Sequence, residues 1–151
     1  MRQSRWVFGS LLSGFVVLAA LSCSAAEDAG EVAPAPARKF TRVPAPDGIQ
    51  IRRYNQTDGA QPRPTDRVRV HYHGTFDDGT VFDSSVERGT PATFPLNRVI
   101  PCWTKAVTLL HVGEKAEVIC PPDQAYGKQG APGRIPPNAR LTFEIELLEV
   151  L

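Results

Sequence analysis

Aromatic and branched apolar residues stand beside a few polar side chains at spacings that suit the wall of a binding pocket. The pocket candidates are Tyr72, Phe82, Asp83, Val99, Ile100, Trp103, Tyr126 and Phe143. Apolar rings exclude water, and a small number of polar groups on the rim can hold a bound molecule in one orientation. The chemistry that suits such a pocket needs shape and dryness rather than a nucleophile, as rotation about a bond does.

These residues lie in short segments that follow one another along the chain. In sequence letters the segments are VHYHG (70–74), GTVFDSS (79–85), VIPCW (99–103), AYG (125–127), IPPN (135–138) and LTFE (141–144). Each segment alone is a weak signal, but together and in this order they resemble the FKBP-type peptidyl-prolyl isomerases. The resemblance runs from about residue 47 to residue 151.

The resemblance implies a peptidyl-prolyl cis-trans isomerase that works without a cofactor or a metal. Rotation of an X-Pro bond meets a barrier of about 18–20 kcal/mol, because the bond has partial double-bond character. Uncatalysed, the rotation takes tens to hundreds of seconds. The planar amide is more dipolar than the twisted transition state, so an apolar pocket raises the ground state relative to that transition state.

The resemblance also assigns roles to individual residues. Asp83, Tyr126 and Tyr72 are expected to be catalytic: Asp83 lies near the twisting amide, and the Tyr126 hydroxyl donates a hydrogen bond to a substrate carbonyl. The backbone N–H of Ile100 is expected to be a second donor, and Trp103 to form the pocket floor. The expected substrate-binding residues are Phe82, Arg88, Val99, Ile100, Trp103, Ile135 and Phe143.

Other interpretations fit the same residues. Spacing alone would favour ordinary core packing for the aromatic residues, and Tyr126 could be a loop-corner tyrosine bonded to nearby backbone. An alternative function is a non-catalytic holdase chaperone of the envelope, which would use the hole only to grip unfolded peptides. A third interpretation is a structural envelope protein.

Two departures from the family pattern concern the rim of the pocket. Ala92 stands where many members have an aromatic residue, and Ala131 stands where the loop often carries a larger one. The expected ligands are proline-containing unfolded or nascent proteins and FK506-like macrolides. We expect these two alanines to change substrate preference or to weaken inhibitor binding rather than to abolish activity.

Alternating apolar residues predict the strands that position this pocket. One run contains Val68, Val70 and Tyr72, and others run from Ala116 to Cys120 and from Leu141 to Leu147. A helical stripe is formed by Trp103, Ala106, Val107 and Leu110, and it is ended by His111 and Gly113. We predict an α+β fold with an antiparallel sheet of five to six strands wrapped around one short α-helix. The stretch from Tyr126 to Asn138 is predicted to be a loop beside the pocket.

The N-terminal third has a different composition. Arg2 and Arg5 precede an apolar run that ends in small residues, which is typical of a secretory signal peptide over residues 1–23. Residues 24–43 are rich in Ala and Pro and are predicted to be a tether, with the isomerase domain at 44–151. Cys23 resembles the lipidated cysteine of a lipobox, and cleavage after Ala26 is the alternative. The expected location is the periplasm or the cell envelope, with a lipid on Cys23 as the only expected membrane contact, and we expect a monomer.

Two cysteines, Cys102 and Cys120, remain available for pairing once Cys23 is lipidated or is cleaved off with the signal peptide. An even number of cysteines in an oxidising compartment favours a disulfide. The alternative is a pair of buried thiols that act as small apolar residues.

Charge and histidine spacing limit the other function classes. Basic residues exceed acidic ones by only one, so we expect no nucleic-acid partner. His71 and His73 share one face of a strand, but no third ligand is evident, and we expect no metal site.

Overall fold

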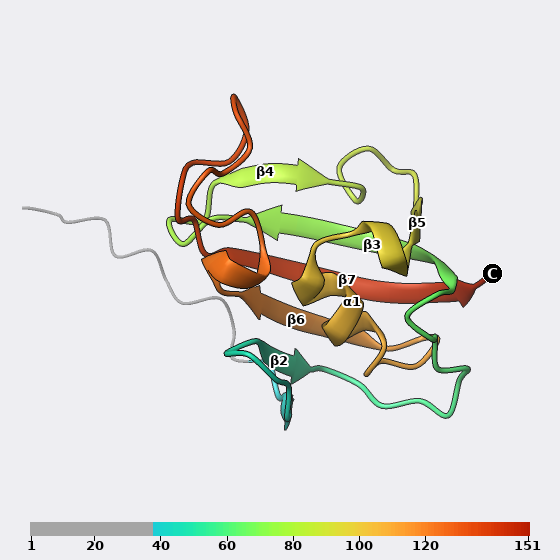
Figure 1. The fold of residues 1–151 in the computed structure, drawn as a ribbon. Helices are drawn as coiled ribbons and strands as arrows, with labels where there is room; N and C mark the ends of the chain where they lie inside the picture. Colours follow the sequence, from blue (N-terminus) through green and yellow to red (C-terminus); the bar gives the residue numbers. More distant parts are fainter. Residues whose placement is uncertain (1–37) are drawn as a thin grey trace, which may run out of the picture. The chain divides into compact units, whose positions relative to one another are not determined.

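The structure is a computed structural model, and it describes residues 38–151 (Figure 1). The expected signal peptide, Cys23 and the tether up to residue 37 lie outside the described residues. The elements of the described region are β1 Thr41–Val43, β2 Gln50–Arg53, β3 Arg67–Thr75, β4 Val81–Ser84, β5 Ala92–Pro95, the 3₁₀ helix η1 Leu96–Arg98, α1 Pro101–Val107, β6 Lys115–Cys120, the 3₁₀ helix η2 Pro122–Gln124 and β7 Leu141–Val150.

The strands form one antiparallel sheet. Its order is β1-β2-β6-β7-β3-β4, and β5 pairs with the remaining length of β3. The long strands β3 and β7 lie at its centre, where Tyr72 is opposite Ile145. The predicted fold class is confirmed, with seven strands in residues 38–151 where five to six were expected. The strand β1 has only three residues and β5 only four, too few for alternation to mark either reliably.

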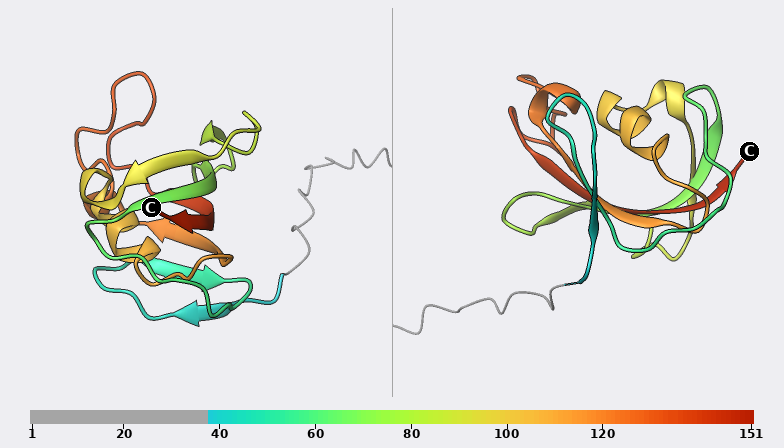
Figure 2. Two further views of the ribbon diagram at one scale, coloured as in Figure 1. Left: turned by 90° about the vertical axis from the view of Figure 1, so that its right-hand side faces the viewer. Right: turned by 90° about the horizontal axis from the view of Figure 1, so that it is seen from below.

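The helix α1 lies across one face of this sheet (Figure 2). Pro101 occupies its first turn, where a missing N–H costs no helical hydrogen bond. The helix ends at Val107, before the predicted end, because the N–H groups of Leu109 and Leu110 bond to the carbonyls three residues earlier in a tighter turn. Leu110 is nevertheless fully buried, as its place in the apolar stripe predicts.

The hydrophobic core fills the space between the helix and the sheet. It combines the predicted helical stripe with the inward side chains of β2, β3, β6 and β7. Alternation is strict along β6, where Ala116, Val118 and Cys120 are fully buried and the residues between them are partly exposed. The helix that carries Trp103 is therefore held in one position against the sheet that carries Tyr72.

The domain begins earlier than residue 44. Thr41–Val43 forms β1 and pairs with β2 at the edge of the sheet. Just before it, the Arg38 guanidinium bonds to the carboxylate of Glu144, and the Phe40 ring lies 5.3 Å from the Arg52 guanidinium. The last part of the expected tether is thus anchored to the sheet by backbone pairing and side-chain contacts that composition does not reveal.

The loop between η2 and β7 is closed on itself. Its two ends are joined by a 2.9 Å hydrogen bond from the Asn138 N–H to the Gly127 carbonyl. Within it, Ala131 and Ile135 form an antiparallel bridge. Gly130 has a φ of 65°, and a Cβ there would meet the Ile135 carbonyl oxygen at 2.3 Å, so the tight turn requires glycine. Tyr126 stands at the start of this closed loop.

Candidate functional site

A pocket of about 500 Å³ opens between α1, the sheet and the Tyr126 loop. It brings together all eight of the predicted pocket candidates and two residues that sequence reasoning missed, Phe94 and Arg98. Its lining residues are Tyr72, Phe82, Asp83, Phe94, Arg98, Val99, Ile100, Trp103, Tyr126 and Phe143. Apolar walls with a few polar groups are typical of a site that encloses a small apolar group.

Trp103 is surrounded edge-on by three other rings. Its centroid lies 5.4 Å from that of Tyr72, 5.5 Å from that of Phe94 and 5.3 Å from that of Phe143, with interplanar angles of 80° to 87°. These are favourable T-shaped contacts. The Trp103 indole N–H is buried and has no hydrogen-bond partner among the described residues. A buried donor left unpaired is more typical of a binding site than of a fully satisfied core.

Phe94 is the aromatic wall that the sequence analysis did not identify. It lies on β5, two residues beyond Ala92, and its ring contacts those of Tyr72 and Trp103 at 5.8 Å and 5.5 Å. Ala92 pairs with Val70 and packs against the core. The partly buried Ala92 and Phe94 flank the exposed Thr93, but a strand of four residues is too short for this alternation to identify it from the sequence.

Tyr72, Asp83 and Arg88 form a polar network on one wall of the pocket. The Tyr72 hydroxyl donates a hydrogen bond of 2.5 Å to Oδ2 of Asp83. The Arg88 guanidinium donates to Oδ1 of Asp83 and, at 2.9 Å, to the Tyr72 oxygen. The carboxylate is therefore held in one orientation by two partners.

The network shifts the pKa values of its members. Partial burial acts to raise the pKa of Asp83, but the hydrogen bonds from Tyr72 and Arg88 and the charge of Arg88 outweigh it, and the pKa is lowered. Burial, followed by the hydrogen bond to Asp83, raises the pKa of the Tyr72 hydroxyl. Asp83 is therefore ionised and Tyr72 is neutral at neutral pH.

The strands β3 and β4 are built to hold this wall. The buried Ser85 hydroxyl accepts a 2.8 Å hydrogen bond from the Tyr72 N–H, and the Ser85 N–H donates to the Tyr72 carbonyl at 2.9 Å. Gly74 leaves room for the Phe82 ring, because a Cβ at that position would meet the ring at 2.6 Å. The motif residues next to Phe82 and Asp83 thus fix the backbone that presents them.

Two hydrogen-bond donors at the pocket are free to meet a ligand. The Tyr126 side chain is 42% exposed, and its hydroxyl bonds to no other described residue. Ile100 precedes α1, where its carbonyl accepts bonds from Trp103 and Thr104 while its N–H donates to no described residue. The alternative of a loop-corner tyrosine bonded to nearby backbone does not describe Tyr126.

Ile135 does not line the pocket. Its side chain is only 7% exposed and belongs to the core, and its backbone N–H and carbonyl both bond to Ala131 across the loop turn at 2.8 Å. The bridge fixes the backbone of Ile135 while its side chain packs into the core. The expectation that Ile135 contacts substrate stays a prediction.

The structure joins Cys102 and Cys120 in a disulfide, with their Cα atoms 5.7 Å apart. Both residues are fully buried. The bond links the residue before Trp103 to the end of β6, just ahead of the Tyr126 loop. A second tie runs parallel to it, since the Lys105 ammonium donates a 2.8 Å hydrogen bond to the Gln124 side chain on η2.

No group of three or more His, Cys, Asp or Glu side chains in residues 38–151 is arranged to hold a metal ion. The Nδ1 atoms of His71 and His73 instead lie 3.2 Å and 3.0 Å from the hydroxyls of Ser85 and Ser84.

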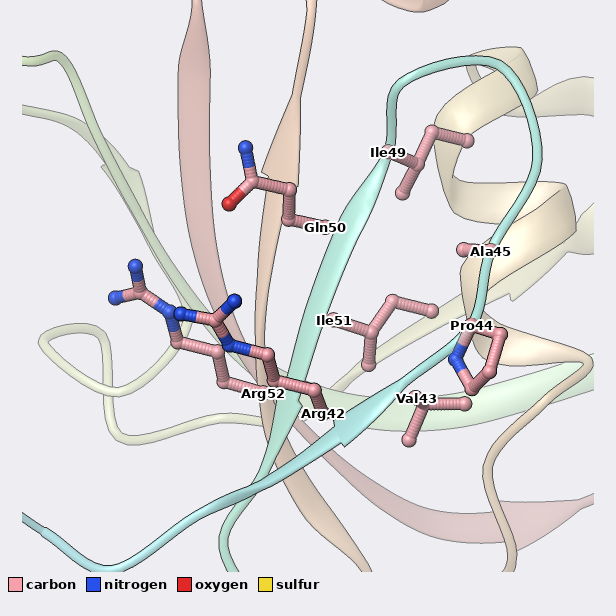
Figure 3. A pocket seen from close by; sticks show the side chains of 8 residues that line it. All are labelled: Arg42, Val43, Pro44, Ala45, Ile49, Gln50, Ile51 and Arg52. Atoms are coloured by element: carbon pink, nitrogen blue, oxygen red, sulfur yellow. The ribbon is translucent and has the colours of Figure 1, made fainter.

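A second hollow lies around the β1–β2 hairpin (Figure 3). Its lining does not converge on one volume: Arg42, Gln50 and Arg52 point to one side of the hairpin, and apolar side chains such as Val43 and Ile51 point to the other. This hollow therefore lacks the convergent aromatic lining of the Trp103 pocket.

The fold and the pocket define a known class. The crystal structure of FkpA from Escherichia coli superposes with a TM-score of 0.70 at 40% identity, covering 76% of this chain and 53% of that one. Residues 59–148 match the family model described as FKBP-type peptidyl-prolyl cis-trans isomerase, and the chain belongs to this family.

Curated relatives support the same assignment. The FKBP-type 22 kDa peptidyl-prolyl cis-trans isomerase of Escherichia coli (strain K12) is 59% identical over 104 residues, which are 69% of this chain and 50% of the relative. FK506-binding protein 1A of Emericella nidulans is 50% identical over 108 residues, which cover 68% of this chain and 98% of the relative. The match therefore spans half of the bacterial relative and almost all of the fungal one.

Proposed function

We propose that this protein accelerates cis-trans rotation of X-Pro bonds in extracytoplasmic proteins as they fold. The observation that carries the proposal is the aromatic pocket around Trp103, with the Tyr72–Asp83–Arg88 network on its wall and free donors at its rim. The family assignment and the shape of the pocket point to the same reaction.

Each part of the pocket has a physical role in this reaction. A proline ring would enter the space between Trp103, Phe94 and Phe143, where water is excluded. Desolvation raises the free energy of the planar, dipolar amide more than that of the twisted one. The Ile100 N–H and the Tyr126 hydroxyl would hold substrate carbonyls on either side of the rotating bond. Asp83 is ionised and fixed in orientation, so its charge would act on the twisting amide without being protonated.

Exchange NMR on a short Leu-Pro peptide tests the proposal directly. Substoichiometric protein should raise the cis-trans exchange rate, and it should also shorten the slow phase of a protein whose refolding is limited by proline isomerisation. The double variant Tyr126→Phe, Asp83→Ala should lose most of this activity. An unchanged rate in the double variant, or no acceleration by the wild type, would contradict the proposal.

The same samples distinguish the holdase alternative. A holdase would suppress aggregation of an unfolded protein at stoichiometric amounts without changing the exchange rate of the peptide. An enzyme acts substoichiometrically, so rate acceleration at a molar ratio well below one separates the two.

Location in the periplasm or cell envelope is part of the proposal. Its support is the signal-like pattern of residues 1–23 and the pairing of Cys102 with Cys120. No helix of the described region is both long and apolar enough to cross a membrane. Mass spectrometry of the mature protein separates a lipid on Cys23 from cleavage after Ala26.

Ligands of the FK506 type are proposed to enter the same pocket, because a relative at 50% identity is named an FK506-binding protein. Competition with the Leu-Pro peptide in the exchange assay tests this. We further propose that the protein is a monomer, which sedimentation analysis checks.

A further inference from the structure

Arg98 is a charged residue of the pocket that the proposed reaction does not use. It ends η1 and is exposed, and it lines the pocket next to Val99 and Ile100. The only other charged residue of the lining is Asp83. Asp83 is compensated by Arg88, whereas Arg98 forms no ion pair with any residue of the described region.

The backbone that carries Arg98 is fixed. Leu96 at the start of η1 is fully buried. Its N–H donates a 3.0 Å hydrogen bond to the Asp66 carbonyl, and its own carbonyl accepts a 2.6 Å bond from the Thr104 hydroxyl on α1. The charge at the pocket mouth is therefore attached to a rigid rim, with a side chain that remains free to reach a bound peptide.

We propose that Arg98 is a specificity-determining residue that favours substrates with a carboxylate on a residue next to the proline. This inference rests on the proposed function, since it concerns the peptides that enter the same pocket. A peptide bound over Trp103 passes the rim on both sides of its proline, and an uncompensated guanidinium attracts a carboxylate and repels an ammonium group. An exposed pair of this kind changes affinity by about two- to five-fold at low salt.

The test compares matched, end-blocked peptides that differ only in the residue beside the proline: Glu, Gln, Lys or Leu, placed before or after it. Exchange NMR gives kcat/KM without a coupling protease, and NMR titration gives Kd. At low ionic strength the wild type should prefer the Glu peptide to the Gln peptide by about two- to five-fold in at least one position. High salt should reduce this ratio, because the charges are exposed.

Variants assign the preference to one residue. Arg98→Gln should bring the Glu-to-Gln ratio to one, and Arg98→Glu should reverse it and favour the Lys peptide, with the Leu peptide little affected. Arg67→Gln is the matched control: Arg67 is also exposed and without an ion pair in the described region, but it lies outside the pocket lining. It should leave every ratio unchanged.

The experiment distinguishes a failure of the role of Arg98 from a failure of the proposed function. Equal ratios in the wild type and Arg98→Glu, or the same loss in Arg67→Gln, overturn the role of Arg98 even if all peptides are isomerised. Charge-dependent Kd values that respond to Arg98 support it even if no peptide is isomerised, in which case the proposed catalysis fails instead. Absence of binding to every peptide overturns both.

Discussion

The Tyr72 hydroxyl on β3 donates a 2.5 Å hydrogen bond to Oδ2 of Asp83 on β4. This contact joins an aromatic wall of the pocket to its one carboxylate. Because the backbone of Tyr72 is itself held by Ser85, the orientation of Asp83 is set by the β3–β4 pairing rather than by the ligand.

Removing this hydroxyl should weaken the network without emptying the pocket. In Tyr72→Phe the ring stays, but Asp83 loses one hydrogen bond and retains those from Arg88 and the Ser84 backbone, so the pKa of Asp83 should rise and kcat/KM should fall. The loss in the free energy of unfolding should be about 0.5–1.5 kcal/mol. Carbon NMR of the Asp83 carboxyl and the peptide exchange assay check both effects.

Tyr54→Phe is a matched control for that variant. The Tyr54 hydroxyl also donates to a carboxylate, that of Glu117 at 3.3 Å, but outside the pocket. The control should leave the pKa of Asp83 and the exchange rate unchanged. An Asp83 pKa that does not move in Tyr72→Phe would show that the Tyr72 hydroxyl does not contribute to it.

Acid should remove the stabilisation that comes from the ionised Asp83. Burial alone would raise the pKa of Asp83, but the bonds from Tyr72 and Arg88 lower it below its ordinary value of 3.8. A carboxylate with a lowered pKa stabilises the fold above its ordinary pKa, and this contribution is lost as the pH falls through the folded-state pKa.

Urea unfolding of the wild type and of Asp83→Asn across pH 2–6 tests this sign. The difference in unfolding free energy between the two proteins should be constant at the upper end of this pH range and should shrink below pH 3.8. Glu144 also has a lowered pKa, against the opposing effect of its burial, through its bonds with Lys115 and Arg38. It is present in both proteins and cancels in the difference. A difference that grows on acidification would contradict the prediction.

Sequence reasoning succeeded where the determinants are local. The alternation of Val68, Val70 and Tyr72 and the helical stripe from Trp103 to Leu110 predicted the buried faces, because burial follows the period of each element. The motifs then placed eight pocket residues in one site, which spacing alone would have assigned to the core.

Other features depend on tertiary packing. Phe94 lies on a four-residue strand whose partner, β3, already pairs with β7 along its length. No pattern in the sequence indicates that Arg98 faces a pocket. Ile135 matches a family motif, its backbone bridges to Ala131 and its side chain belongs to the core, so its contact with substrate stays a prediction. The positions of Phe94 and Arg98 are decided by contacts between segments far apart in the chain, which sequence patterns do not specify.

Tyr126→Phe should separate activity from stability. The hydroxyl is exposed and unpaired within the described region, so its removal should change the free energy of unfolding by less than about 0.5 kcal/mol. If it donates to a substrate carbonyl, kcat/KM should fall by about two- to ten-fold, the equivalent of one hydrogen bond. Urea titration and exchange NMR on the same sample give both values, and an unchanged kcat/KM would remove Tyr126 from the reaction.

The pairing of Cys102 with Cys120 should stabilise the fold by restricting the unfolded chain. The bond closes a loop across 18 positions, which corresponds to about 3 kcal/mol. Reductant should therefore lower the urea midpoint of the wild type. The double variant Cys102→Ala, Cys120→Ala should unfold at a lower urea concentration than the oxidised wild type and should not respond to reductant.

The number of reactive thiols distinguishes the Cys102–Cys120 disulfide from the alternative of two buried thiols. Oxidised protein unfolded without reductant should show no reactive thiol from Cys102 or Cys120, and two reactive thiols would exclude the bond.

The disulfide and the Lys105–Gln124 contact both tie the helix of Trp103 to the segment that leads to Tyr126. Losing the disulfide should therefore also lower kcat/KM for the Leu-Pro peptide under conditions where the variant remains folded. If the folded double variant keeps full activity, the disulfide contributes to stability alone, and the spacing between Trp103 and Tyr126 is set by the rest of the core.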